Sequence, residues 1–567
     1  MNPLVEQIFT LTRTPEFEQY LKNLIVELCL FNTTPNPDVA VMRNAEDGCF
    51  RILERELAAL DFAGARSERR PVNPAIQSHP NYSLLHFTKT KERPQGLSPE
   101  ETYAGRTNLL YFIPGASGQG GQSVAVNSHI DVVAPYFPPR AEGKIVHGRG
   151  SADDKGPTIC AVAALKVLSQ VMAKAGLKWN QNVTIMAVIE EETGGNGSLS
   201  LALDRELKKL YDSLIVLEIT SLKLHPANRG AVWYRAELGN APGACLFEMA
   251  AFVNEEMEKE GAAIRAESRH DLFPQRPVQT CHGIIGSFGE HPSRICGRVS
   301  FAIQFDTTPS QKTALLVHDC LEAGLAGYTG LYGDKSKVVE TATGEPMVPV
   351  HFDFAREGNG FVVTVHGATG HMGAIRERDG AITKMAHLVR SLAQSRAKIE
   401  AIAGGPMRLV LGGNASDDTL VLEGGQGFVP THGIEEVMDR MRRAAQRGAE
   451  TYLWRLGRPE RGEDVVRVTY EKLHNVAFDG DPASQAMQNA IGAAKEVGIW
   501  KEEPVLGWTV SCDARLFATE YPDMPVVTFG PGTLAHAHAD NEQLSLDDAR
   551  AAVEFLAVFL LKQTGTI

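Results

Sequence analysis

Residues 123–131, SVAVNSHID, decide the fold, because a short apolar run there ends directly on a histidine and an aspartate. Similar apolar runs occur on both sides of it, and helical apolar spacing appears between them. The runs are LLYFI (109–113), VTIMAVI (183–189) and SLIVL (213–217); the helical segments are CAVAALKVLSQVM (160–172) and SLSLALDRELKKL (198–210). Apolar strands alternating with helices are typical of a parallel sheet that is buried on both faces. We therefore predict an α/β fold with a mostly parallel central sheet flanked by helices.

Acidic residues and histidines gather where these strands should end. The motifs are His129 and Asp131 in SHID, Asp153 and Asp154 in GRGSADDKG, Glu190, Glu191 and Glu192 in IEEETGGNGS, Glu218 in LIVLEIT, and His538 in GPGTLAHAHADNE. Ligands of parallel sheets bind at the carboxyl ends of the strands. Histidine and carboxylate ligands suit zinc or a similar divalent ion, and one carboxylate between two histidines can hold a metal pair. One such motif has little meaning, but five in succession predict a hydrolytic metal site.

Bulk composition predicts a protein of the cytoplasm that binds neither nucleic acid nor membrane. The 567 residues carry a formal net charge of -13, without the basic stripe that nucleic-acid binding requires. The eight cysteines are scattered and form no CxxC pair, which favours reduced thiols. The first 21 residues do not resemble a secretory signal, and the longest apolar stretch, 551–561, is too short to span a bilayer.

The length and the placement of the motifs predict two domains. At 567 residues the chain is too long for one ordinary core. The metal motifs stop after Glu218 and return only near the C-terminus, so a long insertion is the economical explanation. We predict a catalytic domain made of residues 1–226 and 476–567, interrupted by an α+β lid domain at 227–475. A weak internal repeat divides the lid into tandem ferredoxin-like βαββαβ halves, at about 227–345 and 346–475.

The motifs resemble those of the two-zinc metallopeptidase family that contains aminoacylases, acetylornithine and succinyl-diaminopimelate deacylases, glutamate carboxypeptidases and carnosine-type dipeptidases. HxD, GRGxxDDKG, EE before a glycine-rich turn, a lone acid after a strand, and GPG before HxxNE occur in the family's order. The resemblance covers roughly residues 109–230 and 480–567. It extends to the insertion only in outline and hardly at all to the first hundred residues.

The resemblance implies a ligand set for two zinc ions, with cobalt or manganese as possible substitutes. One ion takes His129 and Glu218, the other takes Glu192 and His538, and Asp153 bridges both. Two ions about 3.5–4 Å apart share a water molecule and lower its pKa towards neutrality. His538 is preferred over His536 because of its HxxNE spacing.

Other residues near these ligands receive roles from the same resemblance. Glu191 is the predicted general base, which carries the water proton to the leaving amine. Asp131 is predicted to accept the imidazole N–H of His129 through its carboxylate. Asp154 is not expected to be a ligand, and the peptide bond before it is often cis in the family.

The lid supplies the remaining predicted contacts with substrate. His371, in VHGATGHMG, matches a lid histidine that donates to the scissile carbonyl oxygen. Gly427 stands where the family usually has an asparagine, so recognition of the substrate carboxylate departs from the pattern. Arg440 and Arg515 are the candidates for that contact. In many relatives the lid histidine comes from a partner subunit; here we predict a monomer in which the second lid half replaces the partner.

The resemblance implies hydrolysis of an amide bond in a small peptide or N-acyl amino acid. Glu218 favours a carboxypeptidase or deacylase, because in the family an aspartate at this position accompanies dipeptidases. The doubled lid points the other way, towards a cytosolic dipeptidase. A third alternative, from another class, is a catalytically silent metal-containing protein that binds such molecules; loss of the base or a ligand would mark it, yet Glu191 and all five ligands are present.

Overall fold

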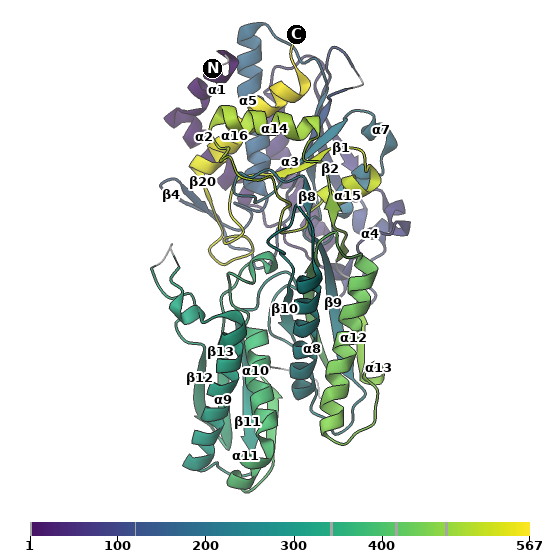
Figure 1. Ribbon diagram of the computed structural model, residues 1–567. Coiled ribbons are helices and arrows are strands. Elements are labelled where there is room, and N and C mark those ends of the chain that lie inside the picture. Colours follow the sequence, from purple (N-terminus) through teal and green to yellow (C-terminus); the bar gives the residue numbers. More distant parts are fainter. Residues whose placement is uncertain (1–2, 119–120, 341–343, 414–417, 471–473) are drawn as a thin grey trace. The chain divides into compact units, whose positions relative to one another are not determined.

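The chain divides into two compact units in the computed structural model, which describes residues 3–118, 121–340, 344–413, 418–470 and 474–567 (Figure 1). The first unit comprises residues 1–230, 269–275 and 472–567, and the second comprises 231–268 and 276–471. The second unit is thus an insertion into the first along the chain.

A six-stranded sheet forms the centre of the first unit, in the order β1-β2-β6-β3-β7-β19. The four strands from β6 to β19 are parallel, whereas β1 and β2 add an antiparallel edge. The sheet is therefore mixed and mostly parallel. Its strands are β1 (Arg66–Pro71), β2 (Thr107–Ile113), β3 (Val124–His129), β6 (Val183–Val188), β7 (Ser213–Leu217) and β19 (Val526–Phe529).

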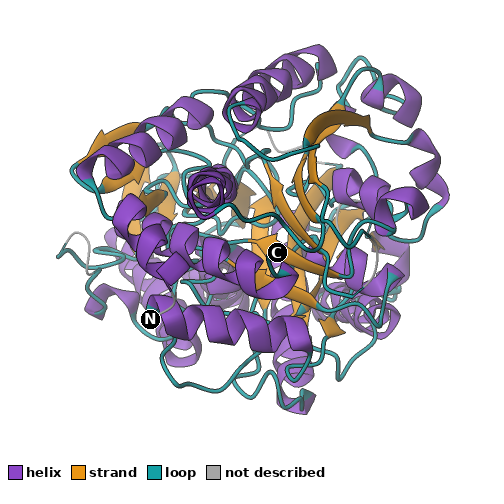
Figure 2. Ribbon diagram, turned by 90° about the horizontal axis from the view of Figure 1, so that it is seen from above, coloured by secondary structure: helices purple, strands orange, loops and turns teal. Residues whose placement is uncertain are grey.

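Both faces of the parallel strands β6, β3, β7 and β19 are buried, as the apolar runs predicted, whereas the edge strand β1 is half-buried to exposed. Alternate side chains of one strand enter different cores: Leu109 and Tyr111 lie in one cluster and Leu110 in the other. Figure 2 shows helices on both sides of the strands. The larger core contains residues of α1 (Pro3–Thr12), α2 (Pro15–Cys29), α3 (Val39–Ala58), α5 (Lys155–Ala175), α14 (Gln485–Val497) and α16 (Leu546–Thr564); the smaller contains residues of α6 (Asn196–Ala202), α7 (Arg205–Lys208) and α15 (Ala514–Glu520).

Two helices of this unit refine the sequence interpretation. The single helical segment predicted at 198–210 is two helices, because the Asp204 side chain accepts hydrogen bonds from the amides of Glu206 and Leu207 and starts α7 anew. Helix α5 is long and apolar enough to span a membrane by composition, but 83% of that stretch is buried inside the fold. It is accordingly a core helix of this unit.

Short elements complete the first unit. A three-stranded sheet has the order β20-β5-β4, and its strands are close in sequence to the candidate ligand loops. Strand β18 pairs with β8. The remaining elements are η1 (Pro74–Ser78), η2 (His86–Thr88), α4 (Pro99–Tyr103), β4 (Arg140–Glu142), β5 (Ile145–His147), β8 (Ala227–Asn228), β17 (His474–Asn475), β18 (Phe478–Asp479) and β20 (Gln543–Ser545).

Two antiparallel sheets build the second unit, and each has the strand order of a ferredoxin-like βαββαβ fold. The first sheet has the order β10-β15-β9-β16, and the second has the order β12-β13-β11-β14. The first half contains β9 (Gly230–Gly239), α8 (Leu246–Glu267), β10 (Thr280–Ile285), β15 (Thr419–Phe428), α12 (Ile434–Arg455), α13 (Gly462–Val465) and β16 (Val466–Thr469). The second contains β11 (Arg298–Phe305), α9 (Gln311–Tyr332), β12 (Phe352–Glu357), β13 (Gly360–His366), α10 (Ala381–Gln394), α11 (Arg396–Ala403) and β14 (Met407–Leu411).

The prediction of tandem halves divided near residue 345 is wrong. The second half is nested in the first, between β10 and β15, which pair with each other although about 140 residues separate them. Likewise β11, assigned from sequence to the first half, pairs with β13 and β14. Apolar periodicity identifies strands but carries no information about their distant partners, so it cannot distinguish a nested from a tandem arrangement.

Candidate metal centre

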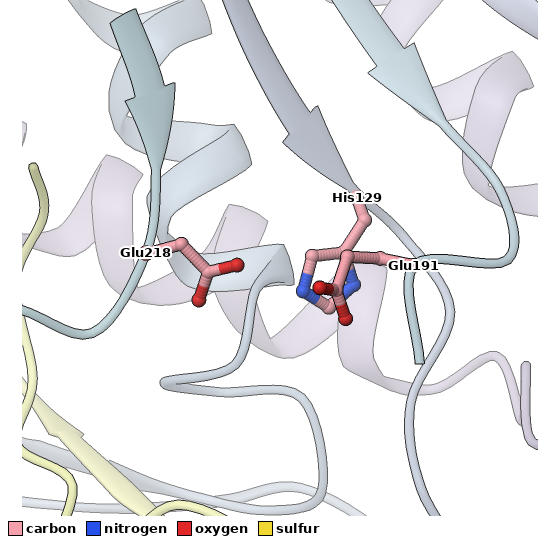
Figure 3. Close-up of side chains that lie close together, drawn as sticks. All are labelled: His129, Glu191 and Glu218. Carbon is pink, nitrogen blue, oxygen red and sulfur yellow. The ribbon is translucent and has the colours of Figure 1, made fainter. Parts of the chain in front are cut away.

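The carboxyl ends of three neighbouring parallel strands bring three of the candidate side chains together. His129 is the last residue of β3, Glu191 lies just beyond β6, and Glu218 directly follows β7. One potential ligand atom from each lies within 4.8 Å of the others. Figure 3 shows the three side chains projecting from these strand ends toward a common space. The order β6-β3-β7 in the sheet makes residues far apart in sequence neighbours in space.

A second group of potential ligands consists of Asp153, Glu192 and His538, again with one atom of each within 4.8 Å of the others. Asp153 connects the two groups. Its Oδ1 lies 3.2 Å from His129 Nε2, and its Oδ2 lies 3.2 Å from His538 Nε2. His538 Nε2 is also 3.0 Å from Glu192 Oε1. The carboxylate of Asp153 therefore presents one oxygen to each histidine, which is the arrangement expected of a bridging ligand.

The charge of this cluster fits a pair of divalent cations. Four carboxylates, Asp153, Glu191, Glu192 and Glu218, are gathered around two histidines, and burial together with the neighbouring acids Asp153 and Glu191 raises the pKa of Glu218. Burial alone would lower the pKa of His538, but Glu192 and Asp153 raise it to about 9. A buried excess of anionic groups is costly without cations. Nitrogen and oxygen donors are also those that zinc and related ions prefer.

Glu191 differs from the five predicted ligands in its exposure. It is half-buried, whereas His129, Asp153, Glu192, Glu218 and His538 are all buried. Burial and the nearby carboxylates of Asp513 and Glu192 raise its pKa, although His129 opposes them. A carboxylate at the rim of such a cluster can reach solvent and substrate while remaining next to the metal position. Its role as base remains a prediction.

Asp131 holds the loop that carries Glu191 and Glu192. Its Oδ1 accepts the amide N–H of Glu191 at 3.1 Å and its Oδ2 accepts that of Glu192 at 2.9 Å. The nearest partner of His129 Nδ1 is the backbone oxygen of Asp131, at 3.1 Å, while Oδ1 is 3.5 Å away. The predicted contact with the imidazole is thus made mainly through the Asp131 main chain. The carboxylate instead binds the backbone amides of Glu191 and Glu192.

Asp154 does not join either group of potential ligands. Its Oδ2 accepts the backbone N–H of His129 at 3.2 Å, and the side chain is fully buried. The peptide bond between Asp153 and Asp154 is cis, as the family resemblance implied. His536, the alternative to His538, belongs to neither ligand group, and its ring lies 3.0 Å from the Gln543 side-chain amide.

Sequence reasoning gave no role to Glu542, although it lies in the HxxNE signature. This fully buried carboxylate accepts hydrogen bonds from three backbone amides of the GRGSADDKG loop, including that of Asp153. The glutamate four residues after His538 was the available signal. Recognising what it contacts required the fold, because its partners lie about 390 residues earlier.

His371 lies in the second unit, at the start of a short 3₁₀ turn, Met372–Ala374. Its Nδ1 accepts the amide N–H of Gly373 at 2.9 Å. A neutral imidazole that accepts at Nδ1 carries its hydrogen on Nε2. The local structure therefore prepares His371 as a hydrogen-bond donor through Nε2, the form that its predicted role requires.

Arg440 lies in α12 of the second unit, and its guanidinium is already neutralised. Its Nε lies 2.7 Å from Glu260, and its two terminal nitrogens lie 2.5 and 2.9 Å from Glu267. An arginine shared between two carboxylates has little charge left for a third. This pairing makes Arg440 a weaker candidate for the substrate carboxylate, and that role stays a prediction based on spacing alone.

Arg515 lies in α15 of the first unit and is fully buried. Its Nη2 donates to the carbonyl oxygen of Gly194 at 2.9 Å. Gly194 belongs to the turn that follows Glu191 and Glu192, so this hydrogen bond helps to hold the turn in place. A role in binding substrate stays a prediction.

An α/β protein with a mostly parallel sheet and buried candidate metal ligands at its strand ends is the class that this fold and this cluster define. The chain belongs to peptidase family M20/M25/M40, whose family model matches residues 125–562. It is accordingly a hydrolase of the metallopeptidase class. Members of the family bind metal ions, and the two groups of potential ligands lie within the matched region.

Curated relatives match only a part of this chain. It is 30% identical over 145 residues to carboxypeptidase G2 of Pseudomonas sp. (strain RS-16), which covers 24% of the chain and 31% of the relative. A putative [LysW]-lysine/[LysW]-ornithine hydrolase of Pyrobaculum aerophilum is 27% identical over 31% of the chain and 48% of its own length. The match thus spans about a third to a half of these relatives.

Solved structures match over nearly the full length. Human carnosine dipeptidase 1 has a TM-score of 0.56 at 12% identity, with 99% of both chains covered. The di-peptidase Dug1p from Saccharomyces cerevisiae has a TM-score of 0.55 at 13% identity, with 99% of this chain and 98% of that chain covered. At such low identity the likeness shows the fold alone.

Proposed function

We propose that this protein hydrolyses the amide bond of a small peptide or an N-acyl amino acid, with two zinc ions as its cofactor. The observation that carries the proposal is Asp153, whose two oxygens face His129 and His538 at equal distances of 3.2 Å. His129 and Glu218 would hold one ion, Glu192 and His538 the other, and Asp153 both. Bound there, the cations supply Lewis-acid polarisation of the carbonyl and lower the pKa of a water molecule.

The remaining chemistry belongs to the protein's own side chains. Glu191 accepts the proton of the attacking water and delivers it to the leaving nitrogen, as its half-buried position beside the ligands allows. Its pKa is raised in the metal-free protein, and cations beside it would lower that pKa and keep it a base. Asp131 keeps Glu191 in place through the backbone amide.

His371 is proposed to stabilise the carbonyl oxygen as it gains negative charge. The hydrogen bond from Gly373 to Nδ1 fixes the ring and leaves the hydrogen on Nε2, so the donor is oriented before substrate arrives. In many relatives the corresponding histidine comes from a partner subunit, whereas here the second ferredoxin-like half belongs to the same chain. We therefore propose that the protein acts as a monomer. Sedimentation at low concentration tests this: activity carried only by a dimer would overturn it.

The carboxypeptidase or deacylase type is favoured by the glutamate at position 218. A dipeptidase is the second candidate, favoured by the two ferredoxin-like halves of the second unit, since a doubled lid resembles that of monomeric dipeptidases. These activities differ in the amino end of the substrate: a dipeptidase recognises a free amine, whereas a deacylase or carboxypeptidase accepts a blocked one.

Matched substrates separate the candidates. Protein stripped of metal and reloaded with zinc, cobalt or manganese is given each dipeptide together with its N-acetyl counterpart, and release of the C-terminal amino acid is measured. Faster release from the blocked member of each pair supports the favoured type, and faster release from the free dipeptide supports the second candidate. No turnover of any pair with two ions bound would contradict the proposal and favour a binding protein.

A further inference from the structure

Glu542 connects two segments that carry potential metal ligands. It is fully buried and lies four residues after His538, just before β20. Its Oε1 accepts the amide N–H groups of Gly150 at 2.9 Å, Ala152 at 3.1 Å and Asp153 at 3.2 Å. Its Oε2 accepts from Arg149 Nη1 at 2.5 Å. One side chain thus attaches the Asp153 loop to the His538 segment.

The Glu542 carboxylate accepts four hydrogen bonds, of which only one comes from its ion-pair partner Arg149. A buried carboxylate is costly unless hydrogen bonds and an opposite charge compensate it, and Glu542 receives both. Three donors converge on one oxygen, and all of them belong to the main chain of residues 150–153. The loop is consequently held at several points at once, and Asp153 is the last residue that Glu542 holds directly.

Asp131 has the same relation to the other ligand loop. Its two oxygens accept the amides of Glu191 and Glu192, as Glu542 accepts those of the Asp153 loop. Each loop is therefore fixed by a buried carboxylate that belongs to neither of the two potential ligand groups. Groups of this kind orient ligands and tune their affinity for metal.

We propose that Glu542 is a positioning residue, which sets the main chain at Asp153 so that its two oxygens face His129 and His538. The inference rests on the proposed function, because it concerns the same pair of ions. Its physical basis is that a bridging carboxylate must meet two ions at once. A displacement of the Asp153 backbone would weaken the contacts with both ions. Displacement of a residue that contacts a single ion would weaken only one contact.

Glu542→Gln tests the proposal with little change in size. The amide has one acceptor oxygen and one NH₂ group, so either the three backbone N–H groups or Arg149 must face a donor. We expect zinc affinity to fall by about 10- to 100-fold, the range for groups that orient metal ligands. Metal-free protein is titrated with zinc against a competing chelator, and cobalt is titrated in parallel to follow the absorption spectrum of its coordination.

Glu554→Gln is the matched control. Glu554 is also a buried carboxylate of the first unit that receives hydrogen bonds from an arginine, Arg13 at 2.9 and 2.8 Å, and from Thr12 at 2.7 Å. Its partners lie in α1 and the residue that follows it, away from the ligand loops in sequence. Both variants should lower the melting temperature of the metal-free protein, but only Glu542→Gln should weaken zinc binding and change the cobalt spectrum.

Equal zinc affinity in the wild type, Glu542→Gln and Glu554→Gln would overturn the proposal, as would an equal loss in both variants. If Glu542→Gln yields no folded protein, Glu542→Asp is titrated instead; its shortened side chain keeps the charge but must lose part of the contacts, and unchanged affinity would again refute the proposal. These titrations use no substrate. A wild type that binds two ions but hydrolyses nothing would remove the proposed function alone and leave this inference standing.

Discussion

Buried charge is arranged differently in the two units. In the second unit, buried carboxylates are paired with cations: Asp379 with Lys384, and Glu248 with Arg396, which also contacts Glu400. The first unit also contains such pairs, for example Glu542 with Arg149, but at its candidate metal centre four carboxylates gather around His129 and His538. Balanced pairs can be satisfied by the protein alone, whereas an anionic excess calls for cations from outside. The difference separates charges that maintain the fold from charges that prepare a metal centre.

The variant Asp153→Ala should have the largest effect and sharpens this comparison. Removing the carboxylate that faces both histidines should abolish binding of the metal pair, and turnover should fall on the order of 10⁴-fold or more, as for other essential groups. Metal content by mass spectrometry and hydrolysis rates measure the two effects. Asp379→Ala is the control from the second unit: it leaves Lys384 buried without its partner and should cost about 3–5 kcal/mol of stability, yet keep both ions. Loss of metal in the control as well would erase the distinction.

Glu191→Gln tests, within the metal centre, whether Glu191 takes part in the reaction or binds a metal ion. The amide cannot accept a proton, so turnover should fall by roughly 10²- to 10⁴-fold, while the protein retains its metal. Zinc titration and single-turnover kinetics on the same preparation test both parts. Near-normal activity would exclude Glu191 as the base, and loss of one ion would make it a ligand instead, which its place beside His129 and Glu218 permits.

His371→Ala tests whether the second unit contributes to the chemistry. Loss of a fixed donor to the carbonyl oxygen should lower kcat by about 10²-fold or more, with zinc affinity unchanged, since His371 lies in neither group of ligands. His371→Gln, which retains a donor, should recover part of the rate. An effect on KM alone would assign the residue to substrate binding.

Zinc binding should depend on pH because a proton occupies the metal position in the metal-free protein. Glu192 and Asp153 outweigh the effect of burial and raise the pKa of His538 to about 9. Below that pH the histidine is protonated, and zinc must displace the proton. Affinity should therefore rise with pH up to about pH 9, by about tenfold per unit for each proton released. Calorimetry in buffers of different ionisation enthalpy counts the protons; release of none would contradict the assignment of His538 as a ligand.

The sequence indicated the chemistry of the first unit better than the architecture of the second. His129, Glu191 and Glu218 lie at strand ends, and the parallel order of those strands gathers them, so local patterns implied a shared site. The β10–β15 pairing depends on contacts across the whole nested half, which no local pattern contains. The hydrogen bonds of Glu542 are equally non-local. Features that follow from a local sequence pattern were predictable. Strand pairings and hydrogen bonds between residues far apart in the sequence were not.

Arg440→Ala should have the smallest effect, and it tests the ion pairs of the second unit. The guanidinium is paired with Glu260 and Glu267, and Glu267 is half exposed, so the free energy of unfolding should fall by only about 1 kcal/mol or less. With its charge already neutralised, the arginine has no strong interaction left for a substrate carboxylate, and KM should not change. Denaturant unfolding and steady-state kinetics measure the two quantities. A KM raised tenfold or more for substrates with a free C-terminal carboxylate, and unchanged for the corresponding amides, would restore Arg440 as the residue that recognises this group and would show that its ion pairs give way when substrate binds.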